Sequence, residues 1–183
     1  NVVEEYTAVD ALTQLSADGQ PQETLLQDLI DAVDYAREDS SIKVMLLLLD
    51  DLQHIGMAKG LELGEALQRF RESGKEIVAM SGSYDQDSYL LAANADRVLV
   101  HNMGGVSIEG FSVVRNYLRD ALEKLKVTMH VFKVGSYKSA VEPLLRNDMS
   151  EEAREANRGW LEPLWDLYRD RIVAARNITV NDF

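Results

Sequence analysis

The sequence predicts an α/β domain in which strands and helices alternate. Two aliphatic runs, 42–49 and 76–80, have the composition of strands that are covered on both faces, as in a parallel sheet. Between and around them lie segments whose apolar residues recur at helical spacing, such as Leu26, Ile30 and Val33. Repeated units of this kind are typical of a sheet covered by helices.

The predicted elements follow one another with short polar connections. The stretch 1–22 has no sustained period, and we expect a short strand or an extended arm there. Thr24 is expected to cap the first helix, and Ser73-Gly74 to end the second. The predicted helices include 25–36, 63–70, 89–93 and 111–125, and the predicted strands include 42–49, 76–80, 97–100 and 127–134.

A long helix is predicted after Ser150, which suits the N-cap position. Pro163 is expected to kink or divide this helix. Its apolar side includes Trp160, Trp165 and Tyr168. Such a stripe fits a core position, and on a terminal helix it also fits a subunit or domain interface.

Two pairs of adjacent residues, one of aspartates and one of glycines, follow predicted strands. The pair Asp50-Asp51 invites an acid/base or metal interpretation, but adjacent residues usually point apart, so we expect a loop or cap role. The pair Gly104-Gly105 serves a turn, and it equally lets a peptide approach the backbone closely. Both interpretations of the glycines are open.

Composition excludes several classes of site. The formal net charge of −12 argues against a nucleic-acid partner and against docking on anionic lipid. There is no cysteine, which excludes disulfides, thiolate nucleophiles and cysteine-bound metals. The three histidines, His54, His101 and His130, are too scattered for a ligand motif, and no metal or cofactor is expected. No apolar run approaches the roughly 20 residues that span a bilayer.

Lys138 is the candidate catalytic residue. The run 127–134 is expected to be a buried strand that Gly135-Ser136 ends, so Lys138 would follow a strand end, where α/β folds tend to keep their sites. A lysine that acts as a general base must be neutral near pH 7, although its free pKa is about 10.4. The alternative from these residues alone is an exposed loop lysine.

The segment V-G-S-Y-K-S-A-V-E-P, residues 134–143, resembles the catalytic-lysine segment of the long-form signal peptide peptidase A family. Weaker similarity extends over 25–176 and includes S-I-K-V-M-L-L-L-L-D and Y-L-L-A-A-N-A-D-R-V. The resemblance implies a crotonase/Clp-protease-like fold and a bacterial membrane-anchored serine peptidase with a Ser/Lys dyad. It also implies signal peptides as substrates, a homo-oligomer, and a domain on the periplasmic side of the inner membrane.

The same resemblance implies that the serine of the dyad lies outside this chain. In short-form members the serine lies after a strand, three residues before an aromatic, and counting back from Tyr89 places Gln86 there. Long-form members resemble two tandem copies, the amino half supplying the lysine and the carboxyl half the serine. This chain resembles the amino half, trimmed of its anchor, with the carboxyl half as its partner. Other nearby serines, Ser81, Ser83 and Ser88, are expected to act in turns or caps.

The predicted organisation is an arm or strand at 1–22, an α/β core carrying Lys138 at 23–148, and a helical extension at 149–183. Two other functions are open. One is a non-catalytic assembly or peptide-binding module, which Gln86 favours for the chain by itself. The other is a crotonase-type enzyme for acyl-CoA thioesters, which the acidity of the chain opposes because such a site needs a basic phosphate pocket.

Overall fold

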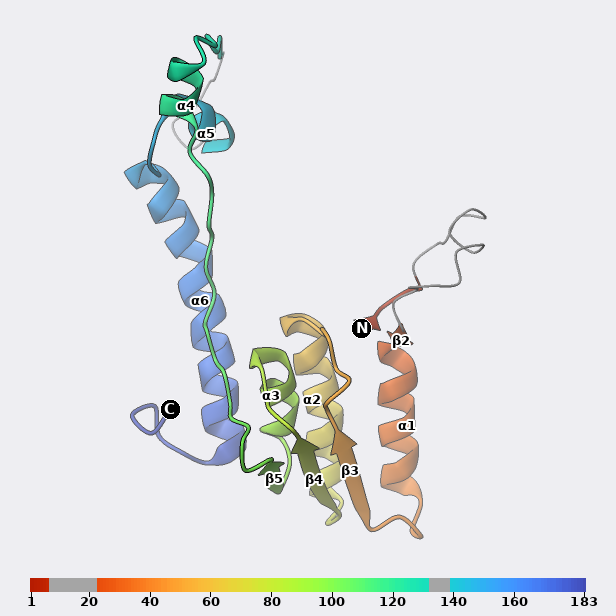
Figure 1. Cartoon of the computed structure of the whole chain (residues 1–183). Coiled ribbons are helices and arrows are strands. Elements are labelled where there is room, and N and C mark those ends of the chain that lie inside the picture. The colour runs from red at the N-terminus through yellow and green to blue at the C-terminus, as the bar shows by residue number, and fades with distance from the viewer. Residues whose placement is uncertain (7–22, 132–138) are drawn as a thin grey trace. The chain divides into compact units, whose positions relative to one another are not determined.

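The computed structural model describes residues 1–6, 23–131 and 139–183 (Figure 1). The chain divides into two compact units. The first comprises Asn1–Glu109 with Tyr168–Phe183, and the second is Gly110–Leu167. The predicted division into 1–22, 23–148 and 149–183 stays a prediction.

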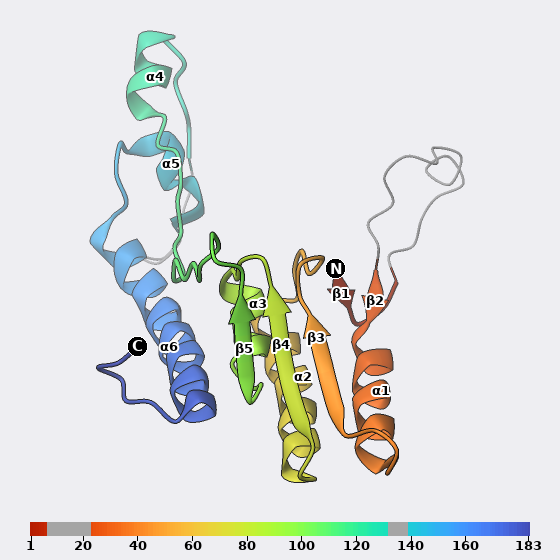
Figure 2. The same cartoon turned by 60° about the horizontal axis from the view of Figure 1, so that its bottom comes forward.

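The first unit contains a parallel sheet of three strands, in the order β3 (Val44–Leu48), β4 (Glu76–Ser81) and β5 (Arg97–Val100). Leu48 pairs with Met80, and Met80 with Leu99, so the carboxyl ends of all three strands meet at one edge. Figure 2 shows these strands side by side, with α2 (Met57–Glu72) and α3 (Gln86–Ala92) behind them. The predicted α/β class is confirmed.

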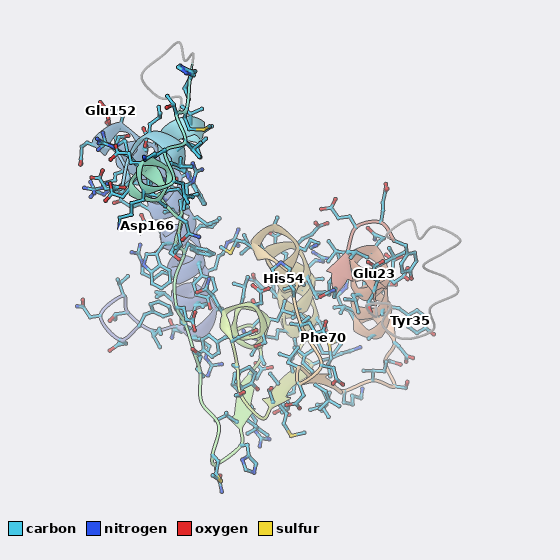
Figure 3. The ribbon with its side chains drawn as sticks, turned by 45° about the horizontal axis from the view of Figure 1, so that its top comes forward. Glu23, Tyr35, His54, Phe70, Glu152 and Asp166 are labelled. Carbon is cyan, nitrogen blue, oxygen red and sulfur yellow. The ribbon has the colours of Figure 1, made fainter. Side chains whose placement is uncertain are left out.

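The core lies between the sheet and its helices. Ile77 and Ala79 of β4 are fully buried, as is Phe70 of α2 (labelled in Figure 3), and α1 (Leu26–Glu38) packs against α2. Two short strands, β1 (Val2–Val3) and β2 (Thr24–Leu25), pair in parallel beside α1. The expected cap at Thr24 is wrong. This residue pairs in β2 instead, and Leu25, which has no polar side chain, occupies the N-cap.

Within the described residues, helices cover only one face of the sheet. The expectation that these strands are buried on both faces is therefore wrong. Alternate residues of β3 are 51%, 54% and 61% exposed, at Val44, Leu46 and Leu48. Met80, which pairs with Leu48, and Leu99, which pairs with Met80, are exposed as well. An aliphatic run therefore marks a strand without showing that both faces are covered.

The second unit contains α4 (Arg119–Lys124), the 3-10 turn η2 (Ser139–Val141), α5 (Glu142–Leu145) and the start of α6 (Glu151–Arg176). The predicted helix 111–125 forms only as α4. Its first part contains Val113, Val114 and Asn116, which are poorer helix formers than the R-D-A-L-E-K of α4. The predicted strand is wrong for 127–131, which joins no described sheet, and 132–134 lie outside the described residues.

The long helix predicted after Ser150 is confirmed as α6, which continues through Pro163 without being divided. Ser150 caps it through a hydrogen bond from Ala153 N–H to Ser150 Oγ, 3.2 Å. Within the described residues, no helix combines the length and apolar character that crossing a bilayer requires.

Candidate active site

Asp50 joins the carboxyl ends of β3 and β4. Its Oδ1 accepts a hydrogen bond from the N–H of Gly82, at 2.6 Å, and lies 3.1 Å from the hydroxyl of Ser81. A carboxylate bonded to a backbone N–H in this way fixes the turn that follows β4. The loop and capping role expected for the aspartate pair is confirmed for Asp50.

The turn after β4 is closed against the segment after β5. Tyr84 donates its N–H to the carbonyl of Gly105 and accepts one from Ser107, at 2.9 and 2.8 Å. A Cβ at Gly104 would lie 1.7 Å from the carbonyl oxygen of Gly82, whereas one at Gly105 would meet no atom within 4 Å. Gly104 is therefore needed for close packing of the chain on itself.

The buried side chain of Tyr84 also holds this turn in place. It is 1% exposed, and its hydroxyl donates to the carbonyl of Leu99 at 2.8 Å. Burial, with a smaller effect of the Asp50 charge, raises the pKa of the Tyr84 phenol. The tyrosine stays neutral near pH 7 and acts as a structural donor.

Two of the nearby serines have structural partners. Ser81 is 3% exposed, and its hydroxyl also lies 2.7 Å from the carbonyl of Ser83. Ser88 is equally buried and forms a capping box with Asp85, in which each side chain binds the backbone N–H of the other. The expected turn and cap roles are confirmed for Ser81 and Ser88. Ser83 is exposed.

Gln86, which occupies the position expected of a nucleophile, is the first residue of α3. Its backbone carbonyl accepts a hydrogen bond from the hydroxyl of Tyr168, at 3.0 Å. Burial strongly raises the pKa of that phenol, so it remains a donor. Tyr168 of α6 thus binds the start of α3 through the backbone carbonyl of Gln86.

His54 and Asp87 form a contact that no sequence pattern predicted. Asp87 Oδ2 lies 2.6 Å from Nδ1 of His54 (labelled in Figure 3), and it accepts the N–H groups of Ile55 and Gly56 at 3.1 Å each. The two residues are 33 positions apart and belong to no motif, so only the fold brings them together. The contact ties the loop before α2 to the first turn of α3.

A groove of about 1180 Å³ lies between α1 and β3 in the first unit. Its walls are mainly aliphatic, with Leu29, Val33 and Leu47 among them, and Asp50 and Asp51 also line it. The described residues that line it include no histidine, lysine or serine. This groove therefore offers mainly apolar contact, together with the two carboxylates.

Lys138 and Ser136 lie outside the described residues. The described chain resumes at Ser139, which begins η2, and α5 starts at Glu142 with Pro143 in its first turn. Glu142 is buried and accepts hydrogen bonds from Ser150. The described part of the chain also contains no group of three or more acidic or histidine side chains placed to hold a metal ion.

Comparison with known proteins decides the family. The model of peptidase family S49 matches residues 69–183, which is more than half of the chain. This chain belongs to peptidase family S49. The resemblance found in the sequence is confirmed at this level.

Relatives of this S49 chain are named as proteases. It is 37% identical to Protease 4 of Haemophilus influenzae and 39% identical to Protease 4 of Salmonella typhi, over 92% and 86% of this chain. It is 26% identical to the chloroplastic serine protease SPPA of Arabidopsis thaliana over 75% of this chain. The alignments cover 28%, 26% and 20% of these relatives, so the chain corresponds to less than a third of their length.

Proposed function

We propose that this chain is the amino-terminal, lysine-bearing half of a membrane-associated serine peptidase that degrades cleaved signal peptides. Lys138 is the general base of a Ser/Lys dyad, and the serine is supplied by the carboxyl-terminal half of the same protein. The core has the crotonase/Clp-protease-like fold, and the full-length protein is a homo-oligomer at the inner membrane, facing the periplasm.

The observation that carries the proposal is membership of peptidase family S49 together with the V-G-S-Y-K-S-A-V-E-P segment around Lys138. Two of the described serines near the turn after β4, Ser81 and Ser88, support an external nucleophile, whereas Ser83 is exposed. Ser81 and Ser88 are buried in local hydrogen bonds, and glutamine stands at the expected nucleophile position. A carboxamide cannot attack a peptide carbonyl, so this chain by itself is expected to be inactive.

In the proposed reaction, neutral Lys138 takes the proton of the serine hydroxyl as the oxygen attacks the peptide carbonyl. The lysinium then gives this proton to the leaving amine, and an acyl-enzyme ester remains. Water hydrolyses the ester with the lysine again as base, which restores the serine. Because only the neutral amine accepts a proton, the rate is expected to rise with pH up to the pKa of Lys138.

The contacts at the start of α3 favour one alternative function, that of a non-catalytic assembly or peptide-binding module. Gln86 and its neighbours form structural contacts there, which is what a half without chemistry requires. In that case Lys138 has no part in the reaction.

The deciding experiment is hydrolysis of a fluorogenic peptide by the full-length protein, with and without Lys138→Ala. Loss of a general base is expected to lower kcat by about 10²- to 10⁴-fold. The matched control is Lys124→Ala, because Lys124 is an exposed lysine of α4 in the same unit. Full activity of an assembled Lys138→Ala variant would favour the assembly module and refute the proposed base.

A further inference from the structure

β3 lies at one edge of the three-stranded sheet, on the side of α1 (Figure 2). The N–H of Leu49 donates to the carbonyl of Met80 in β4, at 3.1 Å. Because the backbone direction alternates from one residue of a strand to the next, the N–H and carbonyl groups of Leu46 and Leu48 point away from β4. Among the described residues, no strand pairs with that side of β3.

The groove of about 1180 Å³ lies at this unpaired edge. The continuous stretch 45–53 lines it, as do Leu29 and Val33 of α1. Leu63 and Leu67 of α2 also line the groove, and they are only 7% and 1% exposed, so the groove reaches the core of the first unit. A free strand edge beside aliphatic walls is what a further β-strand needs in order to pair and pack.

The sequence of β3 contains no residue that protects the edge. Its five residues are V-M-L-L-L, without a charged side chain or a proline. Natural proteins protect an edge strand with lysine, proline or a bulge, or they cover it with another element. Backbone groups that lack a partner beside apolar side chains are also costly. We therefore expect another strand to cover this edge.

A second copy of the chain and the rest of the same protein are the two nearest sources of such a strand. The formal net charge of −12 on each copy opposes edge-to-edge pairing of two copies. The alignments with the two Protease 4 sequences cover 28% and 26% of those relatives, so most of the length of such a protein lies outside the aligned part. A strand in the same protein is also present at an effective concentration of about millimolar when its connection is short.

We propose that the groove between α1 and β3 binds an extended aliphatic strand of the full-length protein that lies outside these 183 residues. The strand pairs with the backbone of Leu46 and Leu48, so that β3 becomes an interior strand. About five residues match the length of β3. Asp50 and Asp51 are exposed carboxylates that line the groove just after β3, so a basic side chain suits that end of the strand. The inference is independent of the proposed catalytic role.

The first measurement is amide hydrogen exchange of the full-length protein, resolved to single residues of β3. The amides of Met45 and Leu47 point toward β4 and are the internal controls. We expect the amides of Leu46 and Leu48 to exchange as slowly as these controls, about 10³-fold or more below the rate of an unpaired backbone. An alternating pattern, in which Met45 and Leu47 are slow while Leu46 and Leu48 are fast, would overturn the proposal.

The second measurement identifies the strand by photo-cross-linking. A diazirine amino acid takes the place of Leu29, which lines the groove. The same amino acid in place of Tyr35 is the matched control, because Tyr35 is an exposed residue of α1 that does not line the groove (Figure 3). The full-length protein is assembled from mixed unlabelled and isotope-labelled chains, so that cross-links within one chain are distinguished from those between copies.

We expect the probe at Leu29, and not the probe at Tyr35, to cross-link within one chain to an aliphatic segment outside these 183 residues. A cross-link from the position of Leu29 to a second copy or to a separate peptide would show that another occupant fills the groove, and it would overturn the proposal. So would the absence of any cross-link from that position.

Discussion

Replacing Gly104 with alanine tests how the carboxyl edge of the sheet is packed. The added Cβ would lie 1.7 Å from the carbonyl oxygen of Gly82 and 2.9 Å from its carbonyl carbon. Separations under 3.0 Å are essentially never seen for real Cβ atoms, so one backbone must move by roughly 1.3 Å. Forced overpacking usually costs about 1–3 kcal/mol, and we expect the upper end because the obstacle is backbone.

Gly105→Ala is the matched control for this change. A Cβ at Gly105 meets no atom within 4 Å, and neither glycine has a positive φ, so the two variants differ only in steric contact. The lower entropy of the unfolded chain is expected to leave Gly105→Ala neutral or stabilised by up to about 1 kcal/mol.

Urea unfolding of the chain, followed by circular dichroism, measures both variants. We expect Gly104→Ala to have a lower free energy of unfolding than Gly105→Ala by about 3 kcal/mol, with similar m values. Equal midpoints for the two variants would show that the turns after β4 and β5 do not meet as described.

Two further predictions concern the first unit. The amine of Lys75 donates to the carbonyls of Ala36 and Asp39 at 2.6 Å each. Lys75→Met is therefore expected to lower the free energy of unfolding by about 1–3 kcal/mol, measured by urea titration. An unchanged midpoint would contradict these hydrogen bonds. A hydrogen bond from Arg69 lowers the pKa of Asp34 below 3.8, so the carboxylate stabilises the fold above that value and the contribution is lost as pH falls through the lowered pKa. Asp34→Asn is therefore expected to be less stable than the parent at about pH 7, and the difference is expected to shrink as the pH falls below 3.8. A difference that does not change with pH would refute this linkage.

The strands and long helices could be predicted because their signals are local. The aliphatic residues of β3 and β4, and the N-cap at Ser150, identify their elements from a few neighbouring positions. The coverage of the sheet could not be predicted in this way. Val44 and Leu46 are as aliphatic as buried residues, and only the three-dimensional arrangement shows that the described residues leave them exposed.

The same difference between local signals and three-dimensional contacts applies to the residues of the candidate site. Lys138 and Gln86 were found because each stands in a recognisable sequence context, and the role of Lys138 stays a prediction. The contacts of Asp50 with Gly82, and of His54 with Asp87, join segments about 30 residues apart. No spacing rule connects such pairs, because their distance is set by the pairing of β3 with β4 and by the packing of α2 against α3.

The start of α3 shows how one turn can serve either catalysis or structure. A strand, a polar turn and a helix can present a nucleophile with backbone N–H groups nearby. In this chain the cap comes from Asp85, the carboxylate of Asp87 binds the loop before α2, and the backbone of Gln86 accepts a hydrogen bond from Tyr168. These contacts come from the side chains of Asp85 and Asp87 and from the backbone of Gln86, and they hold the turn in a chain that has glutamine at this position. Under the proposed function, the serine of the dyad comes from outside this chain, and this chain supplies the scaffold and the base.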